Sequence, residues 1–110
     1  MAAKRSELRA SGDVYEEHRP YDPQVPTIST FYGIAIRMYW REHAPPHFHA
    51  VYQGETVSID ITTLQTIRGW IPRRALSLTL EWAALHREEL LEDWTLCQMA
   101  QTPKRIRPLE

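Results

Sequence analysis

Two alternating runs, HFHAVY and ETVSIDIT, constrain the fold of this chain more than any other feature. They flank Gln53-Gly54, which suits a two-residue hairpin turn because glycine accepts positive φ. With such a loop the facing pairs are Tyr52 and Glu55, Ala50 and Val57, Phe48 and Ile59, His49 and Ser58, and His47 and Asp60. One face of the hairpin then has an apolar centre and the other a polar one. A slip of one residue would mix the two faces, so the pattern predicts this register.

A third alternating run, FYGIAIRMYW, precedes the hairpin and predicts one further strand. Its apolar residues share one side: Ile34, Ile36, Met38 and Trp40. We expect it to lie beside HFHAVY with Trp40 opposite Phe48, Met38 opposite Ala50, Tyr39 opposite His49 and Arg37 opposite Val51. The connection at residues 42–46 contains Pro45-Pro46, which cannot pair inside a sheet.

Helical spacing replaces alternation in the last third of the chain. From Pro72 to about Gln98 the apolar residues recur along one helix face, beginning Ala75, Leu78, Trp82 and Leu85. Pro72 suits the first turn of a helix, and LQTIRGWI before it reads as a short strand or return. The predicted fold class is α+β, a small antiparallel β-meander of 3–4 strands with one long C-terminal α-helix packed on one face.

The two ends of the chain differ from this central pattern. Residues 1–25 mix charges without a sustained period, so we expect a flexible N-terminal extension. Residues 26–101 form the predicted single α+β domain, and residues 102–110 are expected to be a basic C-terminal tail. A length of 110 residues with 43% hydrophobic residues suits one domain with a modest core.

Charge and cysteine content exclude several classes of protein. The formal net charge of −1 argues against a surface that binds nucleic acid as a whole, although a local basic patch stays open. Cys97 is the only cysteine, so no intrachain disulfide can form. No apolar run suits a signal peptide or reaches the ~20 residues of a membrane span, so we expect a cytoplasmic protein with no membrane contact.

Polar residues gather on the predicted sheet face away from the helix: Arg37, Tyr39, His47, His49, Ser58 and Asp60. One interpretation is a face that an antiparallel sheet simply exposes to water. Another is acid–base chemistry, because histidine titrates near neutral pH and Asp60 opposite His47 would orient that ring. With Arg37 and Tyr39 beside them, these residues resemble what metal-independent RNA cleavage requires. Our candidate catalytic residues are His47, His49, Arg37, Tyr39 and Asp60.

Three of the five histidines fall in the stretch REHAPPHFHA, which raises the question of a metal site. His47 and His49 project to the same side of a strand, and His43 or Asp60 would complete a set of three ligands. The spacing matches no established zinc signature, and no thiolate is available. We therefore predict no cofactor; if a metal is present, its expected ligands are His43, His47 and His49.

Arg73 and Arg74 open the predicted helix, where the helix dipole favours acidic residues instead. One interpretation is an anion-binding site, because helix N-termini and guanidinium groups both bind phosphate or carboxylate. The other is a salt bridge to a nearby acid such as Asp60 or Glu55.

Several stretches together resemble the small bacterial family known as domain of unknown function 4160. They are PTISTFYGIAIRMYW, HAPPHFHA, IPRRAL, LEWAALHREELLEDW and KRIRPLE, and they span residues 26–110. Members usually begin at Met-Pro-Thr-Ile, and Val25 stands in the place of that methionine. Residues 1–24 are thus either an extension or a product of an upstream start. The family's polar pattern matches here at His43, Pro45, Pro46, His47, His49, Arg73 and Arg74.

The resemblance also implies a genetic context. Genes of this family often lie beside genes of another small family, domain of unknown function 2442, in pairs that resemble toxin–antitoxin modules. We expect a toxin-like component that acts on RNA or another phosphate-bearing target and pairs with a small protein from the neighbouring gene. The alternatives are a non-catalytic domain that binds such a partner and a histidine-based metal-binding domain.

Overall fold

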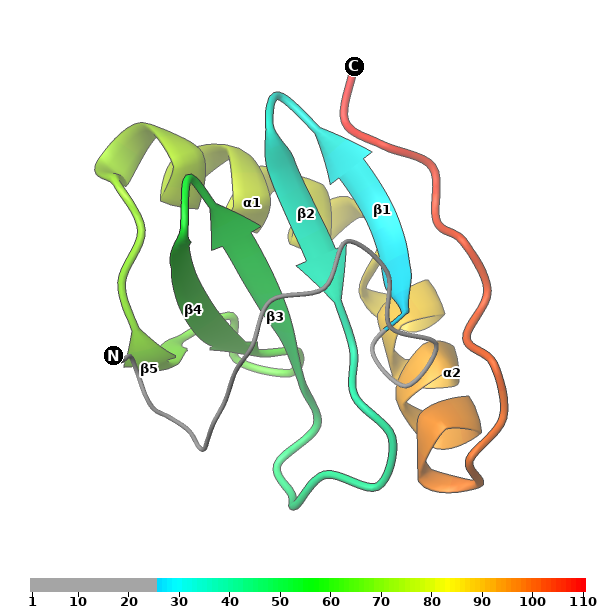
Figure 1. The fold of residues 1–110 in the computed structure, drawn as a ribbon. Coiled ribbons are helices and arrows are strands. Elements are labelled where there is room, and N and C mark those ends of the chain that lie inside the picture. The colour runs from blue at the N-terminus through cyan, green and yellow to red at the C-terminus, as the bar shows by residue number, and fades with distance from the viewer. Residues whose placement is uncertain (1–25) are drawn as a thin grey trace.

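The computed structural model describes residues 26–110, which form a five-stranded antiparallel sheet followed by two helices (Figure 1). The strands are β1 (Thr27–Phe31), β2 (Ile34–Arg37), β3 (His47–Tyr52), β4 (Glu55–Asp60) and β5 (Thr66–Gly69). The helices are α1 (Arg73–Leu85) and α2 (Arg87–Gln98). Each strand pairs with the next one along the chain, in the order β1-β2-β3-β4-β5. The α+β class and the antiparallel meander are confirmed, whereas the predicted 3–4 strands and single long helix are wrong in number.

The additional strand arises from a turn inside the FYGIAIRMYW run. Tyr32 and Gly33 have positive φ values of 52° and 79°, and the chain reverses there so that Phe31 faces Ile34. Alternation continues on both sides of this turn, and for that reason the run resembles one strand in the sequence. The PTISTF stretch thus supplies β1, an edge strand of the sheet.

The predicted single helix is divided at His86. Its φ of −123° lies outside the helical range, and its N–H bonds to the Ala83 carbonyl instead of continuing the α-helical pattern. α2 then restarts with Glu88 and Glu89 in its first turn, where acidic residues favour the helix dipole. Apolar residues continue across the break, so their spacing alone predicts one helix where there are two.

The predicted pairing of β3 with β4 is confirmed at every position, from His47 opposite Asp60 to Tyr52 opposite Glu55. The expected pairing of β2 with β3 is wrong by two residues: Arg37 faces His49 and not Val51. β2 ends at Arg37, and the connection at residues 38–46 leaves the sheet toward α2, where the Arg41 N–H bonds to the Cys97 carbonyl at 3.2 Å. A shift of two residues preserves the face, so Arg37 still shares the polar side with His49.

The apolar face of the sheet packs against the helices around Trp82, which is fully buried. The Trp82 ring lies 5.3 Å from that of Phe31 and 5.9 Å from that of Phe48. Its indole N–H donates to the Arg107 carbonyl at 2.8 Å. The Ile106 N–H bonds to the Ile28 carbonyl at 2.8 Å, so the C-terminal segment runs beside β1 (Figure 1). Residues 102–110, which the sequence predicts to be a basic tail, therefore lie along the β1 edge of the sheet without forming a helix or strand.

Neither helix of the described region is long and apolar enough to cross a membrane.

Candidate functional site

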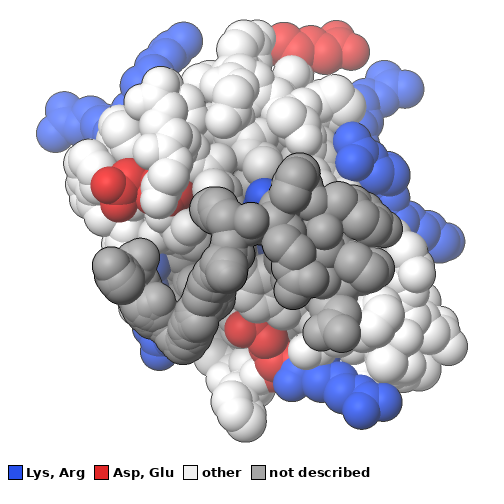
Figure 2. Space-filling model, in the orientation of Figure 1, with Lys and Arg blue, Asp and Glu red and all other residues white. Residues whose placement is uncertain are grey.

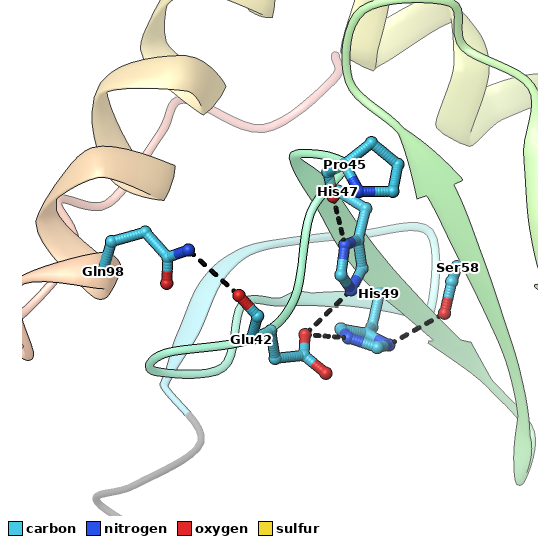
Figure 3. Close-up of polar contacts among 6 residues, drawn as sticks. All are labelled: Glu42, Pro45, His47, His49, Ser58 and Gln98. Carbon is cyan, nitrogen blue, oxygen red and sulfur yellow. Dashed lines mark hydrogen bonds and ion pairs between the residues drawn. The ribbon is translucent and has the colours of Figure 1, made fainter.

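Glu42, His47 and His49 converge at the start of β3 (Figure 3). One carboxylate oxygen of Glu42, Oε1, lies 2.9 Å from Nε2 of His47 and 2.8 Å from Nε2 of His49. The two histidines are alternate residues of β3, so they project from the same face of the sheet. Glu42 comes from the connection at residues 38–46, whose position is fixed by the Gln98 amide of α2 donating to the Glu42 carbonyl at 2.9 Å. We call these three side chains the Glu42–His47–His49 centre.

His47 is held in its doubly protonated form by its two neighbours. Its Nδ1 lies 2.7 Å from the Pro45 carbonyl oxygen, and its Nε2 faces the Glu42 carboxylate. Both neighbours accept hydrogen bonds and cannot donate them, so both contacts are satisfied only when each ring nitrogen carries a hydrogen. The hydrogen bond to Glu42 accordingly raises the pKa of His47, against the opposing effect of burial. This ring can give up a proton from Nε2.

His49, unlike His47, has a neighbour that can both donate and accept a hydrogen bond. Its Nε2 also faces Glu42, but its Nδ1 lies 3.1 Å from the hydroxyl oxygen of Ser58 on β4. A hydroxyl can donate or accept, so Ser58 accommodates His49 with or without a hydrogen on Nδ1. His49 is 8% exposed, and its ring stacks on Tyr39, with 4.2 Å between the ring centroids and 21° between the planes. His49 is thus fixed in orientation, and either tautomer of its ring fits beside Ser58.

Glu42 is ionised at neutral pH. Burial would raise its pKa, but hydrogen bonds and positive charge from His47 and His49 outweigh burial and lower the pKa to about 2. Both contacts use Oε1, which leaves Oε2 without a partner in the described part of the chain. The carboxylate therefore orients two imidazoles and still has one oxygen available.

Two arginines flank His49 and Ser58 in one row across the sheet. The strand pairing places Arg37 opposite His49, His49 opposite Ser58, and Ser58 opposite Arg68. Nε of Arg37 is buried and has no hydrogen-bond partner among the described residues. Arg68 is exposed, and its positive charge opposes protonation of His47, which indicates that it lies near the centre. The row offers two guanidinium groups to an anion bound over the histidines.

Asp60 does not orient His47 as the sequence predicted. It lies opposite His47 in the sheet, but its Oδ1 accepts hydrogen bonds from the N–H groups of Thr62 and Thr63 at 2.7 and 2.9 Å. Asp60 thereby closes the turn after β4. The carboxylate that holds His47 is Glu42.

His43 is exposed and does not join His47 and His49 in the cluster of potential metal ligands. Glu42 is the third member of that cluster. Sequence reasoning missed Glu42 because it lies in an irregular connection, where no period indicates which way a side chain points. The available signal was a carboxylate inside the same ten-residue stretch as the histidines.

Arg73 and Arg74 lie toward the other end of the sheet. The Trp70 N–H, just before α1, bonds to the Thr56 carbonyl. Thr56 is four residues from Asp60 on β4, which corresponds to about 13 Å in a strand. Both arginines are exposed, and no ion pair joins either to a described residue, so the suggested salt bridge to Asp60 or Glu55 does not form. Anion binding at this helix start stays a prediction.

Residues 33–95 match the family model described as Domain of unknown function (DUF4160). The chain belongs to this family. The DUF4160 match runs from the β1–β2 turn into α2 and includes the whole Glu42–His47–His49 centre. Comparison with curated proteins and with solved structures found no match.

Two kinds of chemistry suit the site of this DUF4160 domain. A protonated imidazole beside a second imidazole can exchange protons with a bound substrate. The ligand atoms of Glu42, His47 and His49 also all lie within 4.8 Å of one another, so they can surround a cation.

Proposed function

We propose that this protein is the toxin-like component of a bacterial two-gene module, and that it cleaves RNA by proton transfer at the Glu42–His47–His49 centre. The observation that carries the proposal is the asymmetry between the two rings. His47 faces two acceptors and is held as an imidazolium, whereas His49 faces a serine hydroxyl that accommodates either tautomer. An acid and a base side by side are what cleavage of RNA by its own 2′-hydroxyl requires.

The reaction uses one proton at each ring. When the RNA oxygens replace Oε1 of Glu42 beside the two Nε2 atoms, His49 in its Nδ1–H tautomer donates to Ser58 and accepts the 2′-hydroxyl proton at Nε2. The 2′-oxygen attacks phosphorus, and the bond to the 5′-oxygen breaks as His47 gives that oxygen a proton from Nε2. The products are a 2′,3′-cyclic phosphate and a 5′-hydroxyl. Glu42 acts here as a positioning residue, because its Oε1 contacts Nε2 of both rings and orients them before RNA binds, and it withdraws when the RNA oxygens take that place.

Arg37 and Arg68 supply positive charge to the developing phosphorane. They flank the His49–Ser58 pair, so a phosphate over His49 has a guanidinium on either side. Preorganised cations of this kind stabilise charge that develops in the transition state. Outside the grey atoms, Figure 2 shows Lys and Arg along the margins of this face.

A second candidate function, a non-catalytic domain that binds a small partner protein, is favoured by the exposed sheet edge. All four residues of β5 are exposed, and among the described strands β5 pairs only with β4. Such an edge can accept a strand from another protein. The opposite edge, β1, carries the C-terminal segment through the Ile106–Ile28 hydrogen bond. The product of the neighbouring gene is the partner that we propose.

The test of cleavage uses the purified full-length chain and a labelled single-stranded RNA, with EDTA present. We expect cleavage that leaves cyclic phosphate ends and that falls at least about a hundredfold in His47→Ala and in His49→Ala. His43→Ala is the matched control, because it removes a neighbouring exposed histidine outside the centre.

The test of the module is inducible expression in bacteria, with and without the neighbouring gene. A growth defect that the neighbour relieves and that His47→Ala abolishes supports the toxin-like role. If the two proteins co-purify through β5 and neither the chain alone nor any histidine variant affects RNA, the partner-binding function holds and the cleavage proposal is wrong.

A further inference from the structure

We propose that Glu42, His47 and His49 form a binding site for one divalent transition-metal ion, with Zn²⁺ as the best fit. Two imidazole nitrogens and one carboxylate oxygen lie within 4.8 Å of one another. Both imidazoles present the same atom, Nε2, to the same oxygen, Oε1 of Glu42. The inference goes beyond the proposed function and does not depend on RNA being the substrate.

The surroundings of the two rings support this assignment independently. A metal-binding histidine almost always donates its other ring N–H to a carbonyl, a carboxylate or a hydroxyl, which fixes the ring and its tautomer. The Pro45 carbonyl lies 2.7 Å from Nδ1 of His47, and the Ser58 hydroxyl lies 3.1 Å from Nδ1 of His49. Both Nδ1 atoms therefore have an acceptor in place, and both Nε2 lone pairs are available to one ion once their protons leave.

The donor set selects among metals. Imidazole nitrogen favours Zn²⁺ and other late transition metals over Mg²⁺ and Ca²⁺, which take oxygen ligands. Two histidines and one glutamate, with a fourth position left to water, is a donor set of catalytic zinc sites. Cys97 is buried in α2, and burial raises the pKa of its thiol to about 11, so it supplies no thiolate.

A small movement of Glu42 brings its oxygen to the spacing that zinc requires. Zinc bonds of about 2.0–2.1 Å in a tetrahedron separate the ligand atoms by about 3.3 Å. Oε1 of Glu42 is 2.8–2.9 Å from the two nitrogens, so it must withdraw by roughly 0.4 Å. The Glu42 side chain is 28% exposed and lies in a connection outside the strands, which permits this shift.

Metal binding and the proposed RNA cleavage exclude each other. The ion occupies the Nε2 lone pairs of both rings, so their Nε2 protons are released to solvent on binding. His47 then has no proton to give and His49 no lone pair to accept one. We therefore expect Zn²⁺ to inhibit cleavage, whereas EDTA leaves it intact.

The test is titration of the untagged full-length chain with Co²⁺, followed by visible absorption. We expect one equivalent of Co²⁺ to give the intense bands of a four- or five-coordinate ion with nitrogen ligands, and Zn²⁺ to remove them because it binds such sites more tightly. Glu42→Gln and His49→Ala should weaken Co²⁺ binding at least about tenfold, and His43→Ala should not change it.

The far-ultraviolet circular dichroism spectrum of each variant controls for loss of fold, and Glu42→Gln keeps the shape of the side chain. Absence of the Co²⁺ bands in wild type, or equal affinity in a folded Glu42→Gln variant, overturns the metal site. Because absorption is independent of RNA, a chain that binds Co²⁺ without cleaving RNA refutes only the proposed function. A chain that cleaves RNA and shows no Co²⁺ bands refutes only the metal site.

Discussion

Replacing Glu42 by glutamine keeps the shape of the side chain and removes the charge that His47 and His49 both contact. The interactions of Glu42 lower its pKa from 4.5 to about 2. At 1.36 kcal/mol per pKa unit, this corresponds to about 3 kcal/mol of stability at neutral pH. Because the side chain is 28% exposed, solvent screening reduces this value, and we expect Glu42→Gln to cost about 2 kcal/mol.

The cost should depend on pH in both directions. The folded-state pKa of Glu42 is depressed, so its contribution is present above 4.5 and is lost as the pH falls toward 2. The pKa of His47 is raised, so its contribution is complete below 6.5 and is lost as the pH rises through the folded-state pKa. The stability difference between wild type and Glu42→Gln is therefore greatest at about pH 5.5 and smaller at about pH 2.5 and pH 9.

The assay is urea denaturation followed by the fluorescence of the four tryptophans, at these three pH values. Glu89→Gln is the matched control, because it removes a carboxylate that pairs with His86 and is 51% exposed; we expect it to cost less than about 0.5 kcal/mol. A Glu42→Gln effect that is as small as the control, or that does not vary with pH, would refute the account of His47 as an imidazolium held by Glu42.

Three further predictions follow from described contacts. Asp93 is buried, and burial raises its pKa to about 6. The free energy of unfolding of wild type should therefore fall as the pH rises from 3.8 to about 6. Asp93→Asn should lessen that fall, as measured by denaturation curves at several pH values. Gly69→Ala would place a methyl group 2.1 Å from the Thr56 carbonyl oxygen at a φ of +83°, so it should lower the free energy of unfolding by more than about 2 kcal/mol. Gly54→Ala is the matched control, because nothing lies within 4 Å of the new methyl group, and it should cost about 1 kcal/mol. Arg37→Ala should slow RNA cleavage at least about tenfold at saturating RNA and leave Co²⁺ binding unchanged, because the role that we propose for Arg37 is phosphate binding and it is not among the metal ligands.

Alternation of apolar and polar residues is enough to predict the β3–β4 hairpin at the centre of the sheet. The HFHAVY and ETVSIDIT runs have one register that separates apolar from polar residues, and the structure adopts it. The β2–β3 pairing escaped prediction because the length of β2 is decided by contacts with α2, such as Arg41 N–H to Cys97, and these are distant in sequence. The helix break at His86 escaped because apolar spacing continues through it.

In the candidate site, too, alternation predicts where the strand residues point, and it does not predict the irregular connection. His47, His49, Arg37 and Ser58 were placed on one face from alternation alone, and the structure brings them together. Glu42 lies in an irregular connection whose path depends on the Gln98 contact in α2, so the sequence gives no direction for its side chain. A local rule, that aspartate opposite histidine will pair with it, failed because Asp60 had nearer partners in the turn after β4.

The most direct test of the central claim is the fate of single-stranded RNA incubated with the full-length chain in EDTA. We predict 2′,3′-cyclic phosphate ends whose formation is lost in His47→Ala and His49→Ala, retained in His43→Ala, and inhibited by added Zn²⁺. RNA that stays intact with wild type, or cleavage that is equal in folded His47→Ala and His49→Ala variants, would contradict the claim that this centre transfers protons to and from RNA.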